Sequence, residues 1–192
     1  MVLPLPILSP RLRLEPPRIG DGKWINEAVL SNIENISQWM PWAKPVPDVE
    51  TSEEFVRSAV TDFAARTTLV MLIWNRHTGQ LLGSSGFHEI NWDVPSFETG
   101  YWLRGDALGQ GYVVEAVNAL TRYAFQVLGA KRLAIHCDRD NFKSRAVPET
   151  LGFNLDGVLR NHLLKVDRKE LRDTFIYSRV DLDGLPDLDV DW

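Results

Sequence analysis

The sequence predicts one α/β domain of the α+β kind, with a mixed sheet and several helices. Apolar stretches of strand length alternate with helical patterns along the 192 residues. The strand-helix-strand order over residues 97–138 predicts a right-handed crossover between neighbouring parallel strands. The apolar share of 44% is enough to fill a single core. We therefore expect one domain over residues 1–180, followed by an acidic C-terminal tail over residues 181–192.

The beginning of the chain contains a short strand and two helical regions. Residues 11–15 alternate polar and apolar side chains, which indicates a half-buried strand, and residues 24–36 have a helical pattern. A clearer helix begins at Thr51, which forms a capping box with Glu54. The apolar face predicted for this helix consists of Phe55, Ala59 and Phe63.

A hairpin, a strand and a buried helix follow. Residues 68–74 and 81–88 are apolar and are joined by a turn that ends in glycine, which predicts the hairpin. Residues 97–103 predict one continuous strand. The next helix is marked by apolar residues spaced three and four apart, namely Val113, Val117, Leu120, Ala124 and Val127.

The last part of the chain adds three strands and a short helix. Residues 131–138 predict a strand, and a helix that carries Ser144 comes after it. Pro148 disfavours a long uninterrupted helix, so this helix should be short or bent. Two further strands are expected near residues 157–164 and 173–180.

The charge is concentrated at the C-terminus. Residues 181–192 contain five Asp and no Lys or Arg, so a net charge of -5 minus -5 leaves zero for residues 1–180. The absence of net positive charge in residues 1–180 argues against binding a nucleic-acid backbone as the main activity. We expect the acidic tail to be mobile. Cys137 is the single cysteine, which excludes an internal disulfide. No membrane-spanning stretch or signal peptide is expected, and we predict a cytoplasmic protein.

A glycine turn lies where the strand before residue 104 gives way to a helix. Backbone N–H groups at a helix start have no partner inside the helix, and together with the helix dipole they can hold a pyrophosphate. Gly109 and Gly111 would let such a group approach the backbone closely. The same pattern also suits a helix-entry turn that binds no ligand. Its spacing fits neither a dinucleotide-binding motif nor a P-loop.

Three stretches together resemble the GNAT superfamily of N-acetyltransferases, and within it the ribosomal-protein N-terminal acetyltransferases. They are residues 97–103, the segment Gly-Gln-Gly-Tyr-Val-Val-Glu-Ala at 109–116, and residues 141–153 with Asn-x-x-Ser and Leu-Gly-Phe. The resemblance is strong over residues 79–180. It implies a central mixed, mostly antiparallel sheet of about seven strands with helices on both faces. It also implies a parallel strand pair that splays apart at an acyl-CoA site.

The resemblance implies acetyl-CoA as the co-substrate and names the residues that hold it. Leu103 would meet the pantetheine arm, and Asn141 would bind a pantetheine amide, cap its helix, or do both. The pyrophosphate would lie on Gly109, Gln110, Gly111 and Tyr112. Asp106 stands where family members commonly carry Gln or Arg, which is a departure from the pattern.

The resemblance also proposes catalytic and acceptor-binding residues. Glu98 is the candidate general base, with an ion-paired strand glutamate as the alternative. Ser144 is the candidate hydrogen-bond donor to the sulfur of coenzyme A, unless it only caps or packs its helix. The tyrosine acid that many members place four residues later is replaced by Pro148. Candidate acceptor-side residues, each with simple packing as the alternative, are Trp39, Trp42 and His88.

These residues predict an N-acetyltransferase that works by direct attack in a ternary complex. Freeing a lysine amine (pKa ~10.4) at neutral pH costs about 3 kcal/mol more than freeing a peptide α-amine (pKa ~8), so one modest base favours a protein N-terminus. A polyamine or antibiotic as acceptor, or a non-catalytic acyl-CoA-binding protein, are the alternatives. No metal site, membrane or nucleic-acid partner is expected. A homodimer is compatible with the resemblance, although no stretch of sequence marks its interface.

Overall fold

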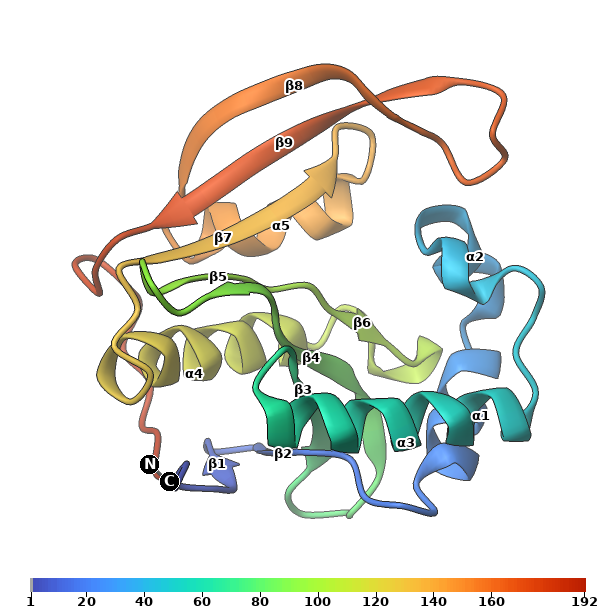
Figure 1. The fold of residues 1–192 in the computed structure, drawn as a ribbon, viewed down its shortest axis with the longest axis horizontal. Helices are drawn as coiled ribbons and strands as arrows, with labels where there is room; N and C mark the ends of the chain where they lie inside the picture. The colour runs from blue at the N-terminus through green and yellow to red at the C-terminus, as the bar shows by residue number, and fades with distance from the viewer. Residues whose placement is uncertain (1) are drawn as a thin grey trace.

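A mixed nine-stranded sheet organises residues 2–192, the part of the chain that the computed structural model describes (Figure 1). The strand order is β1-β2-β3-β4-β5-β7-β9-β8, with β6 beside β4. Every pair is antiparallel except β5 and β7, which run parallel. The strands are β1 (Ile7–Leu8), β2 (Leu12–Glu15), β3 (Leu69–Asn75), β4 (Leu81–Asn91), β5 (Ser96–Glu98), β6 (Trp102–Leu103), β7 (Arg132–Asp138), β8 (Asn154–Leu164) and β9 (Leu171–Arg179).

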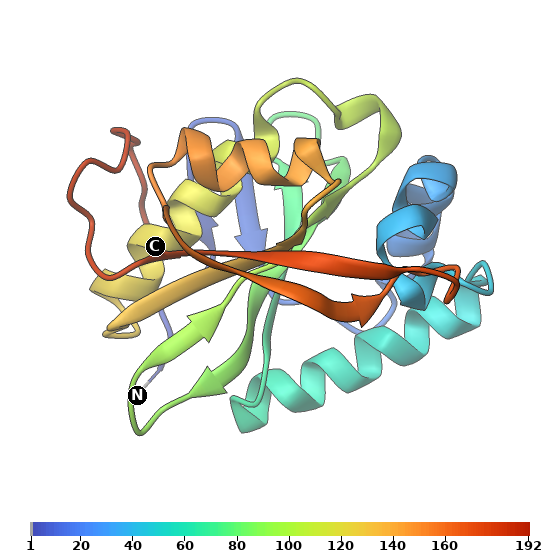
Figure 2. The ribbon, with the colours of Figure 1, turned by 90° about the horizontal axis from the view of Figure 1, so that it is seen from above.

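Helices cover both faces of this sheet, as Figure 2 shows. The first three helices lie on one face, and α4 and α5 lie on the other. The helices are α1 (Gly22–Leu30), α2 (Ile33–Trp39), α3 (Val49–Ala65), α4 (Tyr112–Gln126) and α5 (Phe142–Thr150), with short 3-10 turns η1 (Pro41–Ala43) and η2 (Gly105–Ala107). The predicted fold class is therefore confirmed. The two extra strands are β1 and β6, which are only two residues long.

The sheet opens where β5 and β7 diverge. Their parallel ladder covers only β5, and its last pair is Glu98 with Ala134. Both β5 and β6 pair with β4, but only β5 also pairs with β7, and β7 continues beside β9 as far as Asp138. The predicted continuous strand over residues 97–103 is thus wrong, since it is interrupted at residues 99–101 and only its first part contacts β7. This divergence creates the gap that contains the site.

The sequence pattern predicted the buried face of α4 correctly, but the start and the buried face of α3 only in part. In α4 the expected face is confirmed, because Val117, Leu120 and Ala124 are completely buried. In α3 the predicted capping box is wrong, because Asp48 is the N-cap and its carboxylate accepts a 2.8 Å hydrogen bond from the N–H of Thr51. That bond lowers the pKa of Asp48. The helix therefore begins at Val49 and buries Ser52, Val56 and Ala59, which leaves the predicted core residue Phe55 42% exposed.

The acidic C-terminal segment packs on the domain, so the expectation of a mobile tail is wrong. Asp191 pairs with Leu8 as an antiparallel bridge with N···O distances of 2.7 and 2.9 Å. The ring of Trp192 meets the edge of Tyr123 at 5.8 Å, and Leu185 is only 7% exposed. The apolar residues between the aspartates anchor the segment, which a count of charges does not detect. No helix among residues 2–192 is long and apolar enough to cross a membrane.

Replacing Leu185 by alanine should lower the free energy of unfolding by about 2 kcal/mol, because it removes a buried leucine at the edge of the core. The exposed Asp187, two residues away, is the matched control, and Asp187→Ala should change stability by less than about 0.5 kcal/mol. Urea denaturation of both variants measures the difference. Equal midpoints for the two variants would show that this segment contributes no stability.

Candidate active site

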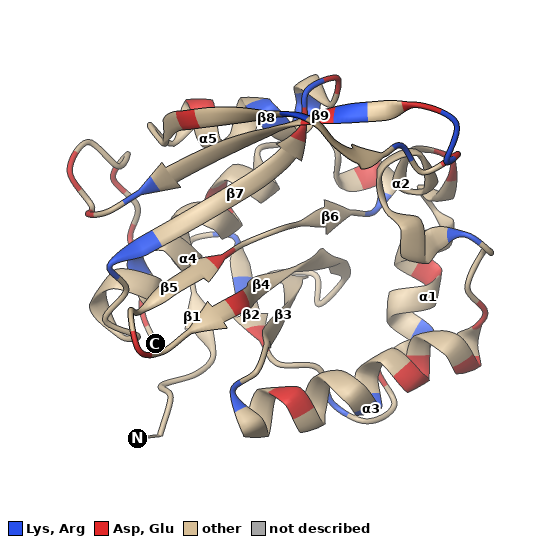
Figure 3. Ribbon diagram, turned by 45° about the horizontal axis from the view of Figure 1, so that its top comes forward, with Lys and Arg blue, Asp and Glu red and all other residues tan. Residues whose placement is uncertain are grey.

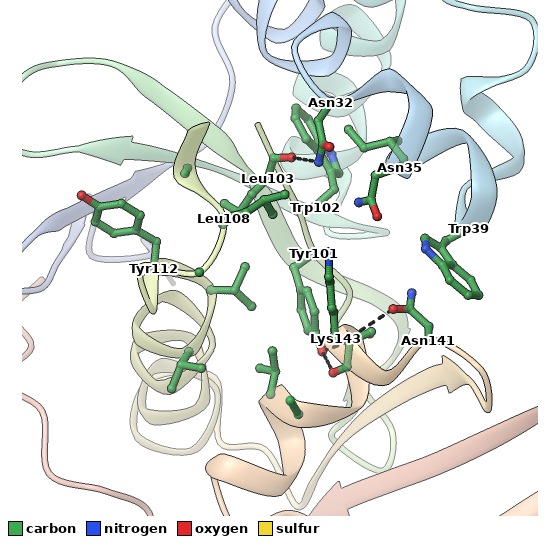
Figure 4. Close-up of a pocket in the computed structure, with 18 of the residues that line it drawn as sticks. Asn32, Asn35, Trp39, Tyr101, Trp102, Leu103, Leu108, Tyr112, Asn141 and Lys143 are labelled. Atoms are coloured by element: carbon green, nitrogen blue, oxygen red, sulfur yellow. Dashed lines mark hydrogen bonds between the residues drawn. The ribbon is translucent and has the colours of Figure 1, made fainter. Parts of the chain in front are cut away.

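A cavity of about 590 Å³ lies in the gap between β6 and β7. Its walls come from α2, β6, the turn that leads into α4, and one side of α5 along its length (Figure 4). The lining is largely apolar and aromatic. Lys143 is the only charged residue among those that line it, and no carboxylate does so within the described residues. A cavity of this size and composition is suited to an extended small-molecule substrate.

The glycine turn supplies a row of free backbone donors along one side of this cavity. Gly109 and Gly111 adopt positive φ angles of 73° and 77°, which a residue with a Cβ rarely takes. A Cβ built on Gly109 would meet no atom within 4 Å, so the space above the turn is open. In residues 2–192, no N–H group from Gly109 through Val114 has a hydrogen-bond partner. Successive free amides at the start of a long helix are well suited to a diphosphate.

A buried carboxylate braces this turn from below. Glu115, in the first turn of α4, is 8% exposed and accepts hydrogen bonds from the hydroxyl of Ser9 (2.7 Å) and the N–H of Arg11 (2.9 Å). The Arg11 guanidinium pairs with the same carboxylate at 2.5 Å, donates to the carbonyl of Gln110 at 2.9 Å and stacks on the ring of Tyr112 at 4.5 Å. These contacts fix the backbone of the turn, because they join it to the loop between β1 and β2.

Replacing Glu115 by alanine should lower the free energy of unfolding by roughly 2 kcal/mol, because Ser9 and Arg11 lose their shared acceptor in a buried place. The exposed pair of Glu50 with Arg57, at 2.9 Å, is a matched control, and Glu50→Ala should cost about 0.5 kcal/mol or less. Chemical denaturation distinguishes the two variants. A loss no greater in Glu115→Ala than in Glu50→Ala would refute the bracing role.

Two polar residues of the turn face away from the cavity. Gln110 does not line it, and its side-chain amide donates to the carbonyl of Asp106 at 2.6 Å. The Asp106 carboxylate, which stands where the family commonly has Gln or Arg, pairs with Arg104 at 2.6 Å. Its charge is therefore balanced locally. The side chains of both residues stabilise the turn, and contact with a phosphate through the Gln110 backbone stays a prediction.

A hydroxyl pair lies at the inner end of the cavity. The Tyr101 hydroxyl donates to the carbonyl of Ser144 at 2.7 Å and accepts from the Ser144 hydroxyl at 3.3 Å (Figure 4). Burial raises the pKa of Tyr101 above its usual range, so this phenol stays protonated at neutral pH. The oxygen of the Asn141 side chain caps α5 by accepting from the N–H of Ser144 at 3.1 Å. The amide nitrogen of Asn141 is left free to donate.

The candidate base lies just outside the cavity lining. The Glu98 carboxylate contacts Nδ1 of His136 at 2.9 Å, and Glu98 pairs across strands with His88. Nδ1 of His88 is buried without a hydrogen-bond partner among the described residues. Three strands thus bring these groups together at the point where β5 and β7 separate. None of the three residues lines the cavity.

The remaining predicted residues divide between the wall and a layer behind it. Trp39 and Leu103 line the cavity, and the carbonyl of Leu103 accepts from the side chain of Asn32 at 2.9 Å. Trp42 does not line it, because it is 47% exposed and its ring packs on Trp102, which does, with centroids 6.1 Å apart. Two tryptophans, Trp39 and Trp102, therefore line the cavity, and contact with an acceptor stays a prediction.

Sequence reasoning missed Tyr101, Arg11 and Glu115. The sequence contained a signal for Glu115. A charged residue in the first turn of a helix with a buried apolar face is a candidate for a buried ion pair. The signal for Tyr101 was weaker. Side chains alternate between the two faces of a strand, so in a continuous strand Tyr101 would lie on the face opposite Glu98. No group of three or more His, Cys, Asp or Glu side chains in residues 2–192 is arranged to hold a metal ion.

Comparison with known proteins agrees with this geometry. The family model described as "Acetyltransferase (GNAT) domain" matches residues 11–154. YdaF of Bacillus subtilis (strain 168), provisionally named a ribosomal N-acetyltransferase, is 28% identical over 79% of this chain and 81% of its own. The ribosomal-protein-serine acetyltransferase of Escherichia coli (strain K12) is 26% identical over 82% of this chain and 86% of its own. The microcin C7 self immunity acetyltransferase MccE, solved with acetyl-CoA and AMP, superposes with a TM-score of 0.83 at 26% identity, over 90% of this chain and 94% of its own.

Proposed function

We propose that this chain, which belongs to the GNAT acetyltransferase family and is an acetyl-CoA-dependent N-acetyltransferase, acts on the N-terminal α-amine of a protein such as a ribosomal protein. The observation that supports the cofactor site most strongly is the row of unpaired amides from Gly109 to Val114 above open space. A diphosphate on these amides would direct the pantetheine arm past Leu103 toward Ser144, because both residues line the same cavity.

The charge of the cavity favours an α-amine over a polyamine. A polyamine carries several positive charges and is bound best by carboxylates, whereas no carboxylate lines this cavity among residues 2–192. An α-amine, with a pKa of ~8, has roughly one-tenth of its molecules unprotonated at pH 7, so it needs no strong base. The names of the two relatives from Bacillus subtilis and Escherichia coli point to a ribosomal protein as the acceptor.

Ser144 and Tyr101 would act on the leaving group. As the amine nitrogen bonds to the acetyl carbon and the carbon–sulfur bond breaks, the two hydroxyls can hydrogen-bond the departing thiolate. Each hydroxyl has one proton, which Ser144 donates to Tyr101 and Tyr101 donates to the Ser144 carbonyl, so a hydroxyl must turn from its present acceptor to donate to the sulfur. With that turn, Tyr101 would take, from the strand side, the role that a tyrosine on α5 would fill if Pro148 were absent. A thiol with a pKa of ~8.5 needs only modest help to leave.

Glu98 and His136 would receive the proton of the amine, directly or through a water molecule. Their 2.9 Å contact orients the imidazole at the point where the strands separate. Glu98→Gln should then lower turnover about 100-fold, as expected for loss of a general base, with little change in acetyl-CoA binding. Unchanged turnover in steady-state assays would remove the assigned role.

The experiment that tests the acceptor uses matched peptides and mass spectrometry. One peptide has a free N-terminal serine and no lysine, and the other has a blocked N-terminus and one internal lysine. With acetyl-CoA, we expect the mass of one acetyl group on the first peptide and none on the second. Acetylation of only the lysine peptide, or of spermidine in preference to both, would overturn the proposed acceptor.

A further inference from the structure

We infer that the acceptor carries a carboxylate close to its reactive amine and that Lys143 binds it. This inference rests on the proposed function, because it names the substrate class of the same cavity. Lys143 is the second residue of α5 and lies directly before Ser144. In the described part of the chain its ammonium group forms no ion pair and no hydrogen bond, although it is the one charge on the wall.

Two amides with unpaired N–H groups line the same cavity as this ammonium group. The side-chain oxygen of Asn141 is occupied by the N–H of Ser144, so the free end of that side chain is its NH₂ group. The side chain of Asn35, on α2, has no hydrogen-bond partner among residues 2–192. Two amides and an ammonium that line one cavity, from α2 and from α5, are suited to a carboxylate, which accepts several hydrogen bonds at once.

The position of Lys143 assigns it to the acceptor rather than to the diphosphate. In Figure 4 its side chain lies in the middle of the view beside Tyr101, apart from Tyr112 of the glycine turn. Residues separated in projection are separated in space. The free amides of the glycine turn are the proposed site of the diphosphate, so we assign Lys143 to a different anion.

The β8–β9 turn on this side has three basic residues and two acidic ones, Asp167 and Glu170. Figures 1 and 2 both place the β8–β9 turn beside α2, and Figure 3 shows blue residues along that turn. The side chains of Arg168 and Lys169 in the turn form no ion pair among the described residues, whereas Lys165 is neutralised by Asp140 and Glu170. An acidic N-terminal segment is therefore attracted to the cavity, and a basic one is repelled.

A peptide series tests the inference directly. Peptides with a free N-terminal serine carry a single Asp, Asn or Lys at the second, third or fourth position, and kcat/KM is measured for each. We expect the best Asp peptide to exceed its Asn counterpart about five-fold, the scale of one partly exposed ion pair, and the Lys peptide to be poorest. This preference should shrink as salt is raised.

Variants of Lys143 provide the decisive comparison. In Lys143→Met the preference for Asp over Asn should disappear, and in Lys143→Glu it should invert in favour of the Lys peptide. Lys131→Met, which removes an exposed lysine at the start of the β7 region, should keep the wild-type preference. Equal kcat/KM for all wild-type peptides would overturn the inference and leave the proposed function intact. A Lys143→Met variant that alters only the KM for acetyl-CoA would also overturn it. Absence of turnover with every peptide would overturn both.

Discussion

Gly109→Ala should weaken acetyl-CoA binding by roughly 10- to 100-fold, the expected effect of losing one charge-assisted hydrogen bond of about 1.5–3 kcal/mol. The new methyl group would occupy the open space above the turn, where it keeps a diphosphate away from the free amides. Isothermal titration calorimetry with acetyl-CoA measures the loss. Turnover at saturating acetyl-CoA should change much less than affinity.

Gly79 provides a control with the same backbone cost. It lies in the turn between β3 and β4, has a φ of 71° against 73° for Gly109, and likewise has open space where a Cβ would be. Gly79→Ala should therefore destabilise the fold to the same small extent and leave acetyl-CoA affinity unchanged. If both variants bind acetyl-CoA like the wild type, the glycine turn does not hold the diphosphate.

Tyr101→Phe should lower kcat about 30-fold, because the variant loses a hydroxyl that orients Ser144 and can turn to donate to the leaving sulfur. Ser144→Ala should have an effect of similar size. Because the two hydroxyls are bonded to each other, the double variant should be little worse than either single one. In the two single variants and the double variant, the KM for acetyl-CoA should change by less than about three-fold. The interactions that bind the ground state and the transition state equally are retained in all of them.

Tyr123 supplies the matched control for this prediction. It is completely buried in α4, and its hydroxyl is buried without a hydrogen-bond partner in residues 2–192. Tyr123→Phe removes the same atom away from the cavity and should leave kcat unchanged. Additive losses in the Tyr101 and Ser144 double variant, or an unchanged kcat in Tyr101→Phe, would contradict a shared role at the sulfur.

The order of the elements follows from the sequence because local signals determine it. The spacing of Val117, Leu120 and Ala124 defines the buried face of α4, and the crossover rule predicts the parallel pairing of β5 and β7. The place where that pairing ends is not a local property. It depends on how far β7 stays beside the segment while β4 pairs with both of its parts, so the break between Glu98 and Trp102 has no signature in the sequence of that strand.

Part of the candidate site is likewise predicted by local motifs, and the rest depends on the tertiary fold. The glycine turn, Asn141 and Ser144 are predicted from contiguous motifs and all contribute to one cavity. The brace of Arg11 on Glu115 joins residues 104 positions apart, and the Tyr101 pair with Ser144 spans 43 positions. Contacts at such separations depend on tertiary packing and no local pattern predicts them. For the same reason the positions of Glu98, His88 and Trp42 outside the lining emerge only from the fold.

A crystal structure of the protein with coenzyme A bound is the most direct measurement. The account predicts diphosphate oxygens within hydrogen-bonding distance of the N–H groups between Gly109 and Val114. It also predicts the sulfur beside the hydroxyls of Tyr101 and Ser144. A diphosphate bound elsewhere on the chain, with those amides facing only water, would contradict it.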